Sequence, residues 1–278
     1  MPLRCTELPP HHARPEAMST LRWPVEDLWE RLEPQLPGLS VEVLAEVDST
    51  NTRLLERARQ GDTAACLLVA ERQHAGRGRQ GRAWQSAPGA SLTFSLGLPL
   101  SPQRWGGLSL AVGVALAEAL HPLLRIKWPN DLWTLDDHGA PAGKLGGILI
   151  ETQGHASATR HVVVGVGLNI EAPPALPDPR HPVAWLRQLD PGLTAAEALT
   201  AAATALVGAL KLFELRGFAA FARRFAARDL LRGRRVRTTK PELPEAQAEG
   251  VDEDGALLLR DAHGLHRLDS GEVSVRPC

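Results

Sequence analysis

The sequence has too few cysteines to build a disulfide framework. Its three cysteines, Cys5, Cys66 and Cys278, are odd in number and far apart, which also excludes the close ligand spacing of a structural zinc site. Such usage is typical of a reducing compartment, and we expect a cytoplasmic protein. Cys66 stands in an apolar run, so it is predicted to be a core residue with no part in catalysis.

Long hydrophobic runs and an excess of either charge are also missing. No stretch reaches about 18 consecutive apolar residues, the length of a membrane span, so we expect no membrane partner. Residues 1–20 contain four prolines and no apolar segment, a pattern that does not match a signal peptide. The 31 Lys and Arg residues balance 32 Asp and Glu, so the net charge is −1. Any phosphate site must therefore be a local basic cluster.

Lysine and asparagine are scarce, which makes the few that occur informative. The chain has 278 residues, 44% of them hydrophobic, and can bury a sizeable core. Arginine replaces lysine almost throughout, and only four lysines and three asparagines remain. Five of these seven residues fall within four short polar or glycine-rich segments: Asn51, Lys127, Asn130, Lys144 and Asn169.

The apolar pattern predicts an α+β protein with a small all-β domain at its C-terminal end. We expect a tail and short helix over 1–38, a main domain over 39–231 and the β domain over 232–278. Helices are predicted at 23–36, 52–60, 108–120, 194–216 and 218–228, with another starting near His181, and 136–142 is predicted as a loop. Main-domain strands are predicted at 41–47, 66–70, 91–98, 125–128, 132–135, 145–151 and 161–167, and C-terminal strands at 236–239, 248–251, 256–260, 265–268 and 273–275. Thr194 and Glu197 form a capping box.

A loop rich in glycine and arginine, Gly76–Arg82, matches the G-x-G-x-x-G pattern without its structural context. No helix opens after it, and the next acidic residue is Glu118, so a dinucleotide-binding turn is excluded. A phosphate-binding P-loop is excluded too, because no G-K-[ST] follows. Arg77, Arg79 and Arg82, hinged by glycines, instead suit a loop that closes over a phosphate or carboxylate.

Three further segments place polar residues at the ends of predicted strands. In the turn from Lys127 to Asp131, the lysine suits a phosphate and the aspartate suits Mg²⁺, although the same residues also make an ordinary hairpin turn. Lys144 precedes an apolar strand beside glycines that let a ligand or a second backbone approach closely. Asn169 ends the strand after that.

Together these segments closely resemble the biotin protein ligases. The motifs that carry the resemblance are 48–51 (DSTN), 73–84 (the arginine loop with its flanks), 127–131 (KWPND), 144–149 (KLGGIL) and 165–169 (GVGLN). The similarity runs from about residue 40 to the C-terminus. It implies a mixed-sheet, class II synthetase-like catalytic domain followed by a small SH3-like β-barrel.

The resemblance implies an enzyme that activates biotin with ATP and Mg²⁺ to biotinyl-5′-AMP and then transfers biotin to a lysine of a biotin carboxyl carrier protein. It assigns catalysis to Lys144 and Arg79. Biotin contacts are expected from Ser49, Thr50, Asn51, Gln73, Gly76, Arg77, Gly78, Arg79 and Lys144. ATP or adenylate contacts are expected from Arg77, Arg82, Trp84, Lys127, Asn130 and Asn169, and the Mg²⁺ ligand from Asp131.

Three other functions compete with this interpretation. A lipoate ligase or octanoyltransferase would share the fold, and a regulator that only binds biotinyl nucleotide would share the pocket. A nucleic-acid module would use the basic loop, but the loop lacks interleaved aromatic residues. The short segment before the core has no basic recognition helix, so we expect no repressor domain and no nucleic-acid partner. A homodimer is compatible with the resemblance.

Overall fold

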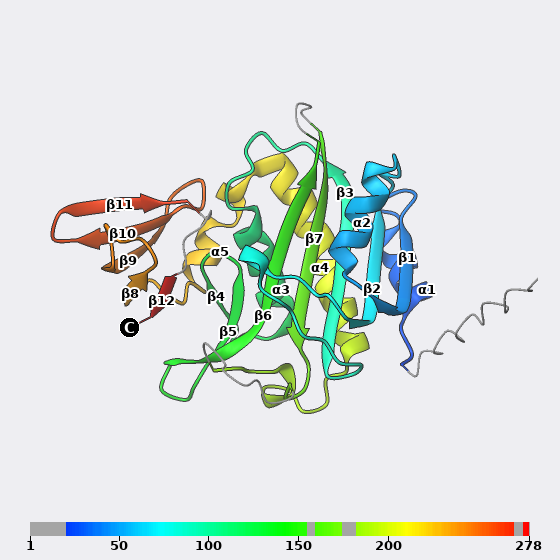
Figure 1. The fold of residues 1–278 in the computed structure, drawn as a ribbon, viewed down its shortest axis with the longest axis horizontal. Helices are drawn as coiled ribbons and strands as arrows, with labels where there is room; N and C mark the ends of the chain where they lie inside the picture. The colour runs from blue at the N-terminus through cyan, green and yellow to red at the C-terminus, as the bar shows by residue number, and fades with distance from the viewer. Residues whose placement is uncertain (1–20, 155–158, 174–181, 270–274, 278) are drawn as a thin grey trace, which may run out of the picture.

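The computed structural model describes residues 21–154, 159–173, 182–269 and 275–277. Its larger sheet contains β1 (Ser40–Val47), β2 (Cys66–Gln73), β3 (Ser91–Leu100), β4 (Arg125–Lys127), β5 (Asp131–Leu135), β6 (Pro141–Gln153) and β7 (Arg160–Asn169). These seven strands lie in the order β1-β2-β3-β7-β6-β5-β4, as Figure 1 shows. β1 and β2 are parallel and joined by a helix, whereas all other neighbours are antiparallel. The mixed α+β fold is therefore confirmed.

Helices cover both faces of this sheet. The helices are α1 (Val25–Leu32), α2 (Thr50–Arg59), α3 (Leu108–Leu120), α4 (Ala195–Arg216) and α5 (Ala222–Ala226). α2 lies in front of the sheet in Figure 1, and α3 and α4 lie behind it. Successive side chains of β2 point to opposite faces of the sheet. Leu68 joins a small apolar cluster with Leu54 of α2, and Leu67 joins the main core. Burial on both faces explains why β2 reads as a continuous apolar run rather than as an alternating one.

The long helix α4 has the predicted capping box. Thr194 accepts from the Glu197 backbone N–H at 3.2 Å, and the Glu197 carboxylate accepts from the Thr194 N–H at 2.9 Å. Among the described residues, α4 is the one helix long and apolar enough to cross a membrane, with a mean hydropathy of 1.5 over its most apolar window. Half of that window is buried inside the fold, where α4 packs on α3, as a core helix does.

Several predicted elements differ from the structure. The predicted helix over 218–228 is wrong: a 3₁₀ turn at Phe218–Ala220 is followed by the five-residue α5. The first helix is eight residues long rather than fourteen. β6 begins at Pro141, inside the predicted loop, because its first half pairs with β5 in a bulged hairpin. Lys144 thus lies within a strand. The helix start near His181 and residues 273–274 fall outside the described residues.

A second, smaller sheet follows the main domain in sequence. It contains β8 (Arg235–Thr238), β9 (Glu245–Val251), β10 (Leu257–Asp261), β11 (Gly264–Leu268) and β12 (Val275–Pro277), in the order β11-β10-β9-β8-β12, all antiparallel. Among the described residues no pairing joins β11 to β12 to close a barrel. The SH3-like barrel therefore stays a prediction, and an antiparallel sheet domain is what the structure shows.

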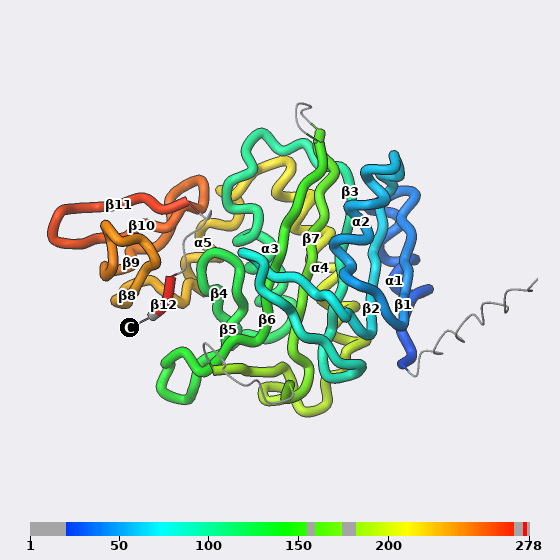
Figure 2. The backbone as a smooth tube through the Cα atoms, viewed as in Figure 1, coloured from blue at the N-terminus to red at the C-terminus, as the bar shows by residue number. Residues whose placement is uncertain are grey.

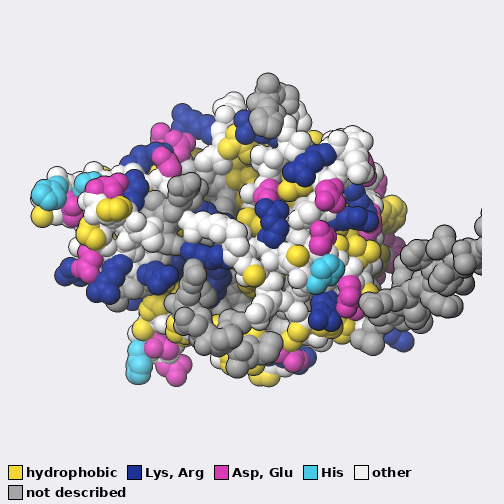
Figure 3. Space-filling view, viewed as in Figure 1, with side chains coloured by type: hydrophobic (Ala, Val, Ile, Leu, Met, Phe, Trp, Pro, Cys, Tyr) yellow, Lys and Arg dark blue, Asp and Glu magenta, His cyan; other side chains and the backbone are white. Residues whose placement is uncertain are grey.

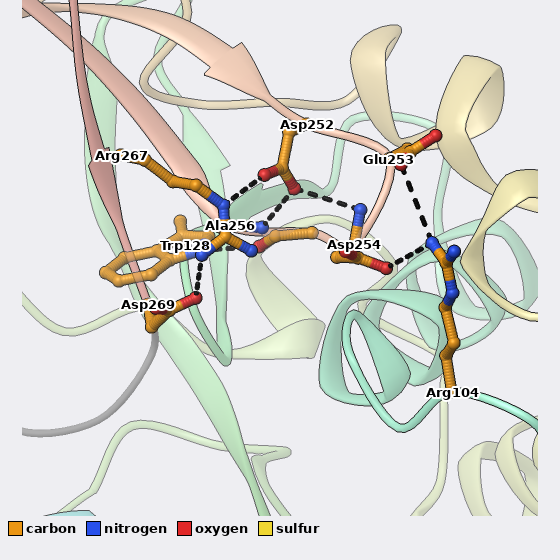
Figure 4. Close-up of polar contacts among 9 residues, drawn as sticks. Arg104, Trp128, Asp252, Glu253, Asp254, Ala256, Arg267 and Asp269 are labelled. Carbon is orange, nitrogen blue, oxygen red and sulfur yellow. Dashed lines mark hydrogen bonds and ion pairs between the residues drawn. The ribbon is translucent and has the colours of Figure 1, made fainter.

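The turn between β9 and β10 docks the small sheet onto the main domain. The buried Trp128 donates its indole N–H to the Gly255 carbonyl at 3.1 Å. Figure 4 shows Asp252 holding the turn through the N–H groups of Asp254 and Ala256, both at 2.9 Å. Arg104 adds an ion pair to Asp254 at 3.2 Å. Trp128 thus joins the small sheet to the Lys127–Asp131 turn of the main domain.

Substituting Gly255 is expected to loosen this docking. A Cβ there would lie 2.6 Å from the Gly107 Cα atom, and Gly255 has φ +77°. Gly139 has nearly the same φ, +76°, with nothing within 4 Å. Both alanine variants bear the backbone strain, but only Gly255→Ala also meets a clash, so we expect it to be less stable by a further 1–3 kcal/mol or so. Urea unfolding of the two variants measures the difference; equal stabilities would contradict close docking.

His161 at the start of β7 is a buried histidine. Its Nδ1 atom has no hydrogen-bond partner, and burial lowers the pKa of the imidazole, a shift that the negative charge of Asp62 partly offsets. The unfolded chain therefore binds a proton more readily than the folded one. We expect stability to be lost as pH falls below the ordinary value of 6.5 toward the lowered folded value.

Urea unfolding at about pH 7.5 and about pH 5.5 tests this expectation. His161→Gln should lose less stability on acidification than the wild type does. His138→Gln, at an exposed turn, is the matched control and should behave like the wild type. An unchanged acid response in His161→Gln would contradict the expectation.

Candidate active site

One cavity of about 440 Å³ gathers the candidate residues from segments far apart in the chain. It is bounded by β5, β6 and β7, by the start of α2 and by the connection between β2 and β3, which crosses the front of the sheet in Figure 2. The predicted residues on its wall are Ser49, Thr50, Asn51, Gln73, Arg77, Gly78, Arg79, Arg82, Trp84, Lys127, Asn130, Asp131, Lys144 and Asn169. Gly76 is the one predicted site residue that does not line it.

The arginine loop is a narrow hairpin closed by backbone hydrogen bonds. Trp84 N–H donates to the Gly76 carbonyl at 2.8 Å, and Gly78 N–H donates to the Arg82 carbonyl at 2.7 Å. Gly76 is required for this closure, because a Cβ there would lie 2.5 Å from the Trp84 carbonyl oxygen. At the tip, Gln80 adopts a left-handed conformation with φ 57°. Gly76 therefore shapes the loop rather than the cavity wall.

The loop arginines differ in their surroundings. Arg77 pairs with Glu151 at 3.0 Å. Burial lowers the pKa of Arg79, and the negative charge of Asp131 acts in the opposite direction. Arg82 donates to the Gln80 side chain at 2.9 Å. On the face shown in Figure 3, basic and acidic side chains are interspersed over the described residues, so the positive charge here is local.

Two lysines share one carboxylate at the centre of the cavity. Asp131 accepts from the Lys144 ammonium at 2.5 Å through one oxygen and lies 3.7 Å from the Lys127 ammonium through the other. The hairpin explains this arrangement, since Lys127 pairs directly with Asp131 and Trp133 with Lys144. The three charges sum to one positive charge, which suits an anionic ligand. Burial lowers the pKa of Lys127, the negative charge of Asp131 acts in the opposite direction, and the positive charges of Lys144 and Arg276 lower it further.

The glycines after Lys144 have two different functions. A Cβ on Gly146 would lie 2.5 Å from the Gly167 carbonyl oxygen, so this glycine lets β6 and β7 pack together. A Cβ on Gly147 would meet only the Lys144 ammonium and an Asp131 oxygen, at 3.5 and 3.7 Å. Gly147 lines the cavity, so it keeps space open beside the lysine.

Glycines on β7 make room for two side chains of the wall. Gly165 and Gly167 are two residues apart and face the same side of the sheet. A Cβ on Gly165 would lie 2.1 Å from the Asn51 amide oxygen, and one on Gly167 would lie 2.5 Å from the Trp84 ring. The Asn51 side chain therefore packs directly on the backbone of Gly165, and the Trp84 ring packs on that of Gly167.

The start of α2 supplies a buried polar end to the cavity. Ser49 caps the helix by accepting from the Thr52 N–H at 3.5 Å. Thr50 N–H donates to the Gln73 amide oxygen at 2.8 Å, and Ser95 Oγ lies 2.6 Å from the Thr50 hydroxyl. A rigid set of donors and acceptors of this kind suits a polar, uncharged ligand group.

Two of the predicted asparagines also have structural partners. Asn130 donates its amide to the Ile148 carbonyl at 2.8 Å, and Asn169 donates to the Ala184 carbonyl at 3.0 Å. These bonds hold the Lys127–Asp131 turn against β6 and hold residue 184 beside the end of β7. Both asparagines line the cavity as well.

Sequence reasoning missed several residues that line or support this site, among them Ser95, Glu151, Val275 and Arg276. Ser95 and Glu151 lie inside strands, where no local pattern marks them. Val275 of β12 lines the cavity, and the charge of neighbouring Arg276 acts on Lys127, so the C-terminal sheet contributes to the same site. For Val275 and Arg276, the available signal in the sequence was their place in the C-terminal region that resembles the family.

The cavity offers electrostatic chemistry without an activated nucleophile. Cys66, which does not line it, is buried, and burial raises the pKa of its thiol to about 11. Within the described parts of the chain, Asp131 is the single acidic residue on the wall, and no cluster of three metal-binding side chains occurs there. Because its carboxylate already contacts two lysines, it does not by itself form a Mg²⁺ cage.

Sequence and structure comparisons agree on one family. The profile of the biotin/lipoate A/B protein ligase family matches residues 43–169, and that of the biotin protein ligase C-terminal domain matches residues 233–276. The chain is 36% identical to the bifunctional ligase/repressor BirA of Salmonella typhimurium, over 89% of this chain and 78% of that one. It is 35% identical to the biotin–[acetyl-CoA-carboxylase] ligase of Mycobacterium tuberculosis, over 91% and 96%. The structure resembles the biotin protein ligase of Aquifex aeolicus in complex with biotin and ATP, with a TM-score of 0.71, 27% identity and coverage of 86% and 99%.

Proposed function

Because the chain belongs to the biotin protein ligase family, we propose that this ligase converts biotin and ATP to biotinyl-5′-AMP and then biotinylates a lysine of a biotin carboxyl carrier protein. The observation that supports the proposal most is the pair of lysines sharing Asp131 in one cavity with the arginine loop. The cavity has a polar, uncharged end at α2 and a cationic centre, which matches a ligand with a polar ring and a carboxylate tail.

The proposed orientation follows from this polarity. The ring system of biotin lies at Ser49, Thr50 and Gln73, where buried hydrogen-bonding groups are fixed. Its carboxylate extends toward Lys144. The phosphates of ATP lie near Lys127, Arg79 and Arg82. The Trp84 ring, on the cavity wall, covers the apolar part of the adenylate.

In the first step a carboxylate oxygen of biotin attacks the α-phosphorus of ATP, and the bond to pyrophosphate breaks. Two anions must approach, so the cations lower the barrier by offsetting their repulsion. Lys144 is placed at the reacting carboxylate, and Asp131 orients its ammonium. Arg79 stabilises the charge that develops on the phosphate. In the second step the carrier lysine amine attacks the acyl carbon, and AMP leaves with the bonding electrons.

Mg²⁺ enters this proposal as part of the ATP substrate. The described residues supply one carboxylate, already shared by two lysines, and Mg²⁺ commonly takes one or two carboxylates together with phosphates. Asp131 would provide the protein ligand if the phosphates supply the others. No step depends on that contact.

The acceptor, location and assembly remain proposals as well. We propose a carrier protein of acetyl-CoA carboxylase as the partner, since relatives are named for that enzyme. A cytoplasmic location, a homodimer and the absence of a nucleic-acid partner remain predictions from the sequence.

Biotin-dependent exchange of labelled pyrophosphate into ATP tests the proposal. We expect exchange with biotin and none with lipoate. Exchange with lipoate alone would favour the lipoate ligase alternative, and binding of biotinyl nucleotide without any exchange would favour a non-catalytic regulator. Biotin transfer to a purified carrier domain then tests the second step.

A further inference from the structure

Glu151 on β6 connects the arginine loop to the polar end of the cavity. One carboxylate oxygen lies 3.0 Å from the Arg77 guanidinium, and the other accepts from the Asn51 amide at 3.0 Å. We propose that Glu151 is a positioning residue that holds the arginine loop in its binding conformation before any substrate arrives. The expected effect on biotin binding rests on the proposed function, whereas the conformation of the loop can be tested without it.

The Asn51 side of this connection is rigid. Its amide also donates to the Leu149 carbonyl at 3.1 Å, and its oxygen lies 2.6 Å from Ser95 Oγ. Asn51 and Ser95 are buried, with exposures of 3% and 0%, and Gly165 leaves no space between Asn51 and β7. Glu151 is therefore anchored on the protein core, and Arg77, whose guanidinium also lies 3.5 Å from the Thr52 hydroxyl, is the partner that belongs to the loop.

The Arg77 side of the connection controls the loop. Arg77 pairs with Ala83 across the hairpin, so a contact that holds the strand segment at Arg77 also holds the segment at Ala83. Gly76 and Gly78 flank Arg77, and glycine permits many backbone conformations. The ion pair selects one of them. Arg79, at the loop tip, and Trp84, at its base, are placed as a result.

The geometry assigns Arg77 a different task from the anion contact expected from the sequence. Its charge is compensated by Glu151, whose side chain is 22% exposed, while the Arg77 side chain is 48% exposed. A pair this accessible contributes little to global stability. Its effect appears instead in ligand affinity, because apparent affinity falls in proportion to the fraction of molecules whose loop is competent to bind.

Limited trypsin digestion of the ligand-free protein tests the structural part. Cleavage after Arg79 and Arg82 is followed by mass spectrometry in the wild type, Glu151→Gln, Arg77→Gln and the double variant. We expect each single variant to be cleaved about fivefold faster than the wild type, and the double variant no faster than Arg77→Gln. Glu42→Gln removes a similar carboxylate–arginine pair, with Arg57, away from the cavity and should be cleaved at the wild-type rate.

Steady-state kinetics tests the functional part. In Glu151→Gln the KM for biotin should rise about fivefold while kcat stays within about twofold, since the occupied site is unchanged. Wild-type cleavage rates in Glu151→Gln, or additive effects in the double variant, would overturn the inference. A wild-type enzyme without pyrophosphate exchange would instead refute the proposed function, because the digestion contains no substrate.

Discussion

Replacing Lys144 with alanine is expected to lower the rate of biotin-dependent pyrophosphate exchange by about 10²–10³-fold. The ammonium lies on the wall of the cavity, 2.5 Å from Asp131, and a preorganised charge of this kind is worth about that factor. Biotin binding should weaken much less, since the polar end at α2 is untouched. Isothermal titration with biotin and the exchange assay measure the two quantities separately.

A matched set of variants separates chemistry from structural damage. Lys240→Ala removes a partly exposed lysine that does not line the cavity and should retain wild-type exchange. Lys144→Ala removes one of the cations that face Asp131, so Lys144→Ala/Asp131→Asn removes the carboxylate charge together with it. If exchange recovers in the double variant, the loss arose from the charge of Asp131 without Lys144 beside it, and Lys144 has no direct part in the reaction.

Gly146→Ala is expected to lower the stability of the protein, whereas Gly147→Ala is expected to lower kcat/KM. Gly146→Ala places a Cβ 2.5 Å from the Gly167 carbonyl oxygen in the middle of the paired strands, so we expect the free energy of unfolding to fall by about 1–3 kcal/mol. Gly147→Ala meets no atom closer than 3.5 Å and should unfold like the wild type. Its methyl group occupies the space beside Lys144, and one misplaced methyl in a fitted pocket corresponds to about a tenfold or greater loss in kcat/KM.

Urea unfolding and the exchange assay on both variants test this separation. The expected pattern is a destabilised Gly146→Ala and a stable Gly147→Ala with reduced kcat/KM. A Gly147→Ala enzyme with unchanged kinetics would show that biotin and ATP do not approach this strand. A Gly146→Ala protein as stable as the wild type would contradict the close packing of β6 on β7.

Local features of the fold were predictable from local sequence. The capping box of Thr194 and Glu197 and the helix cap at Ser49 follow from side chains that act on their own backbone within a few residues. The bounds of α3 match those predicted from the helical periodicity of its apolar residues. The prediction of one helix after Gly217 was wrong because contacts from distant parts of the chain decide the structure there. The apolar residues of this segment pack against α3 and α4 as a short 3₁₀ and helical turn, a choice that tertiary contacts make.

The sequence by itself determined which residue types would be available: scarce lysines and asparagines in short segments, and arginines between glycines. Only the tertiary structure decided how they combine. Strand register set Asp131 between two lysines, and the pairing of Asn51 with Glu151 joins residues 100 positions apart. The C-terminal sheet reaches the same cavity through Val275. Register and docking depend on the burial of whole faces of sheets, a non-local quantity that no short window of sequence contains.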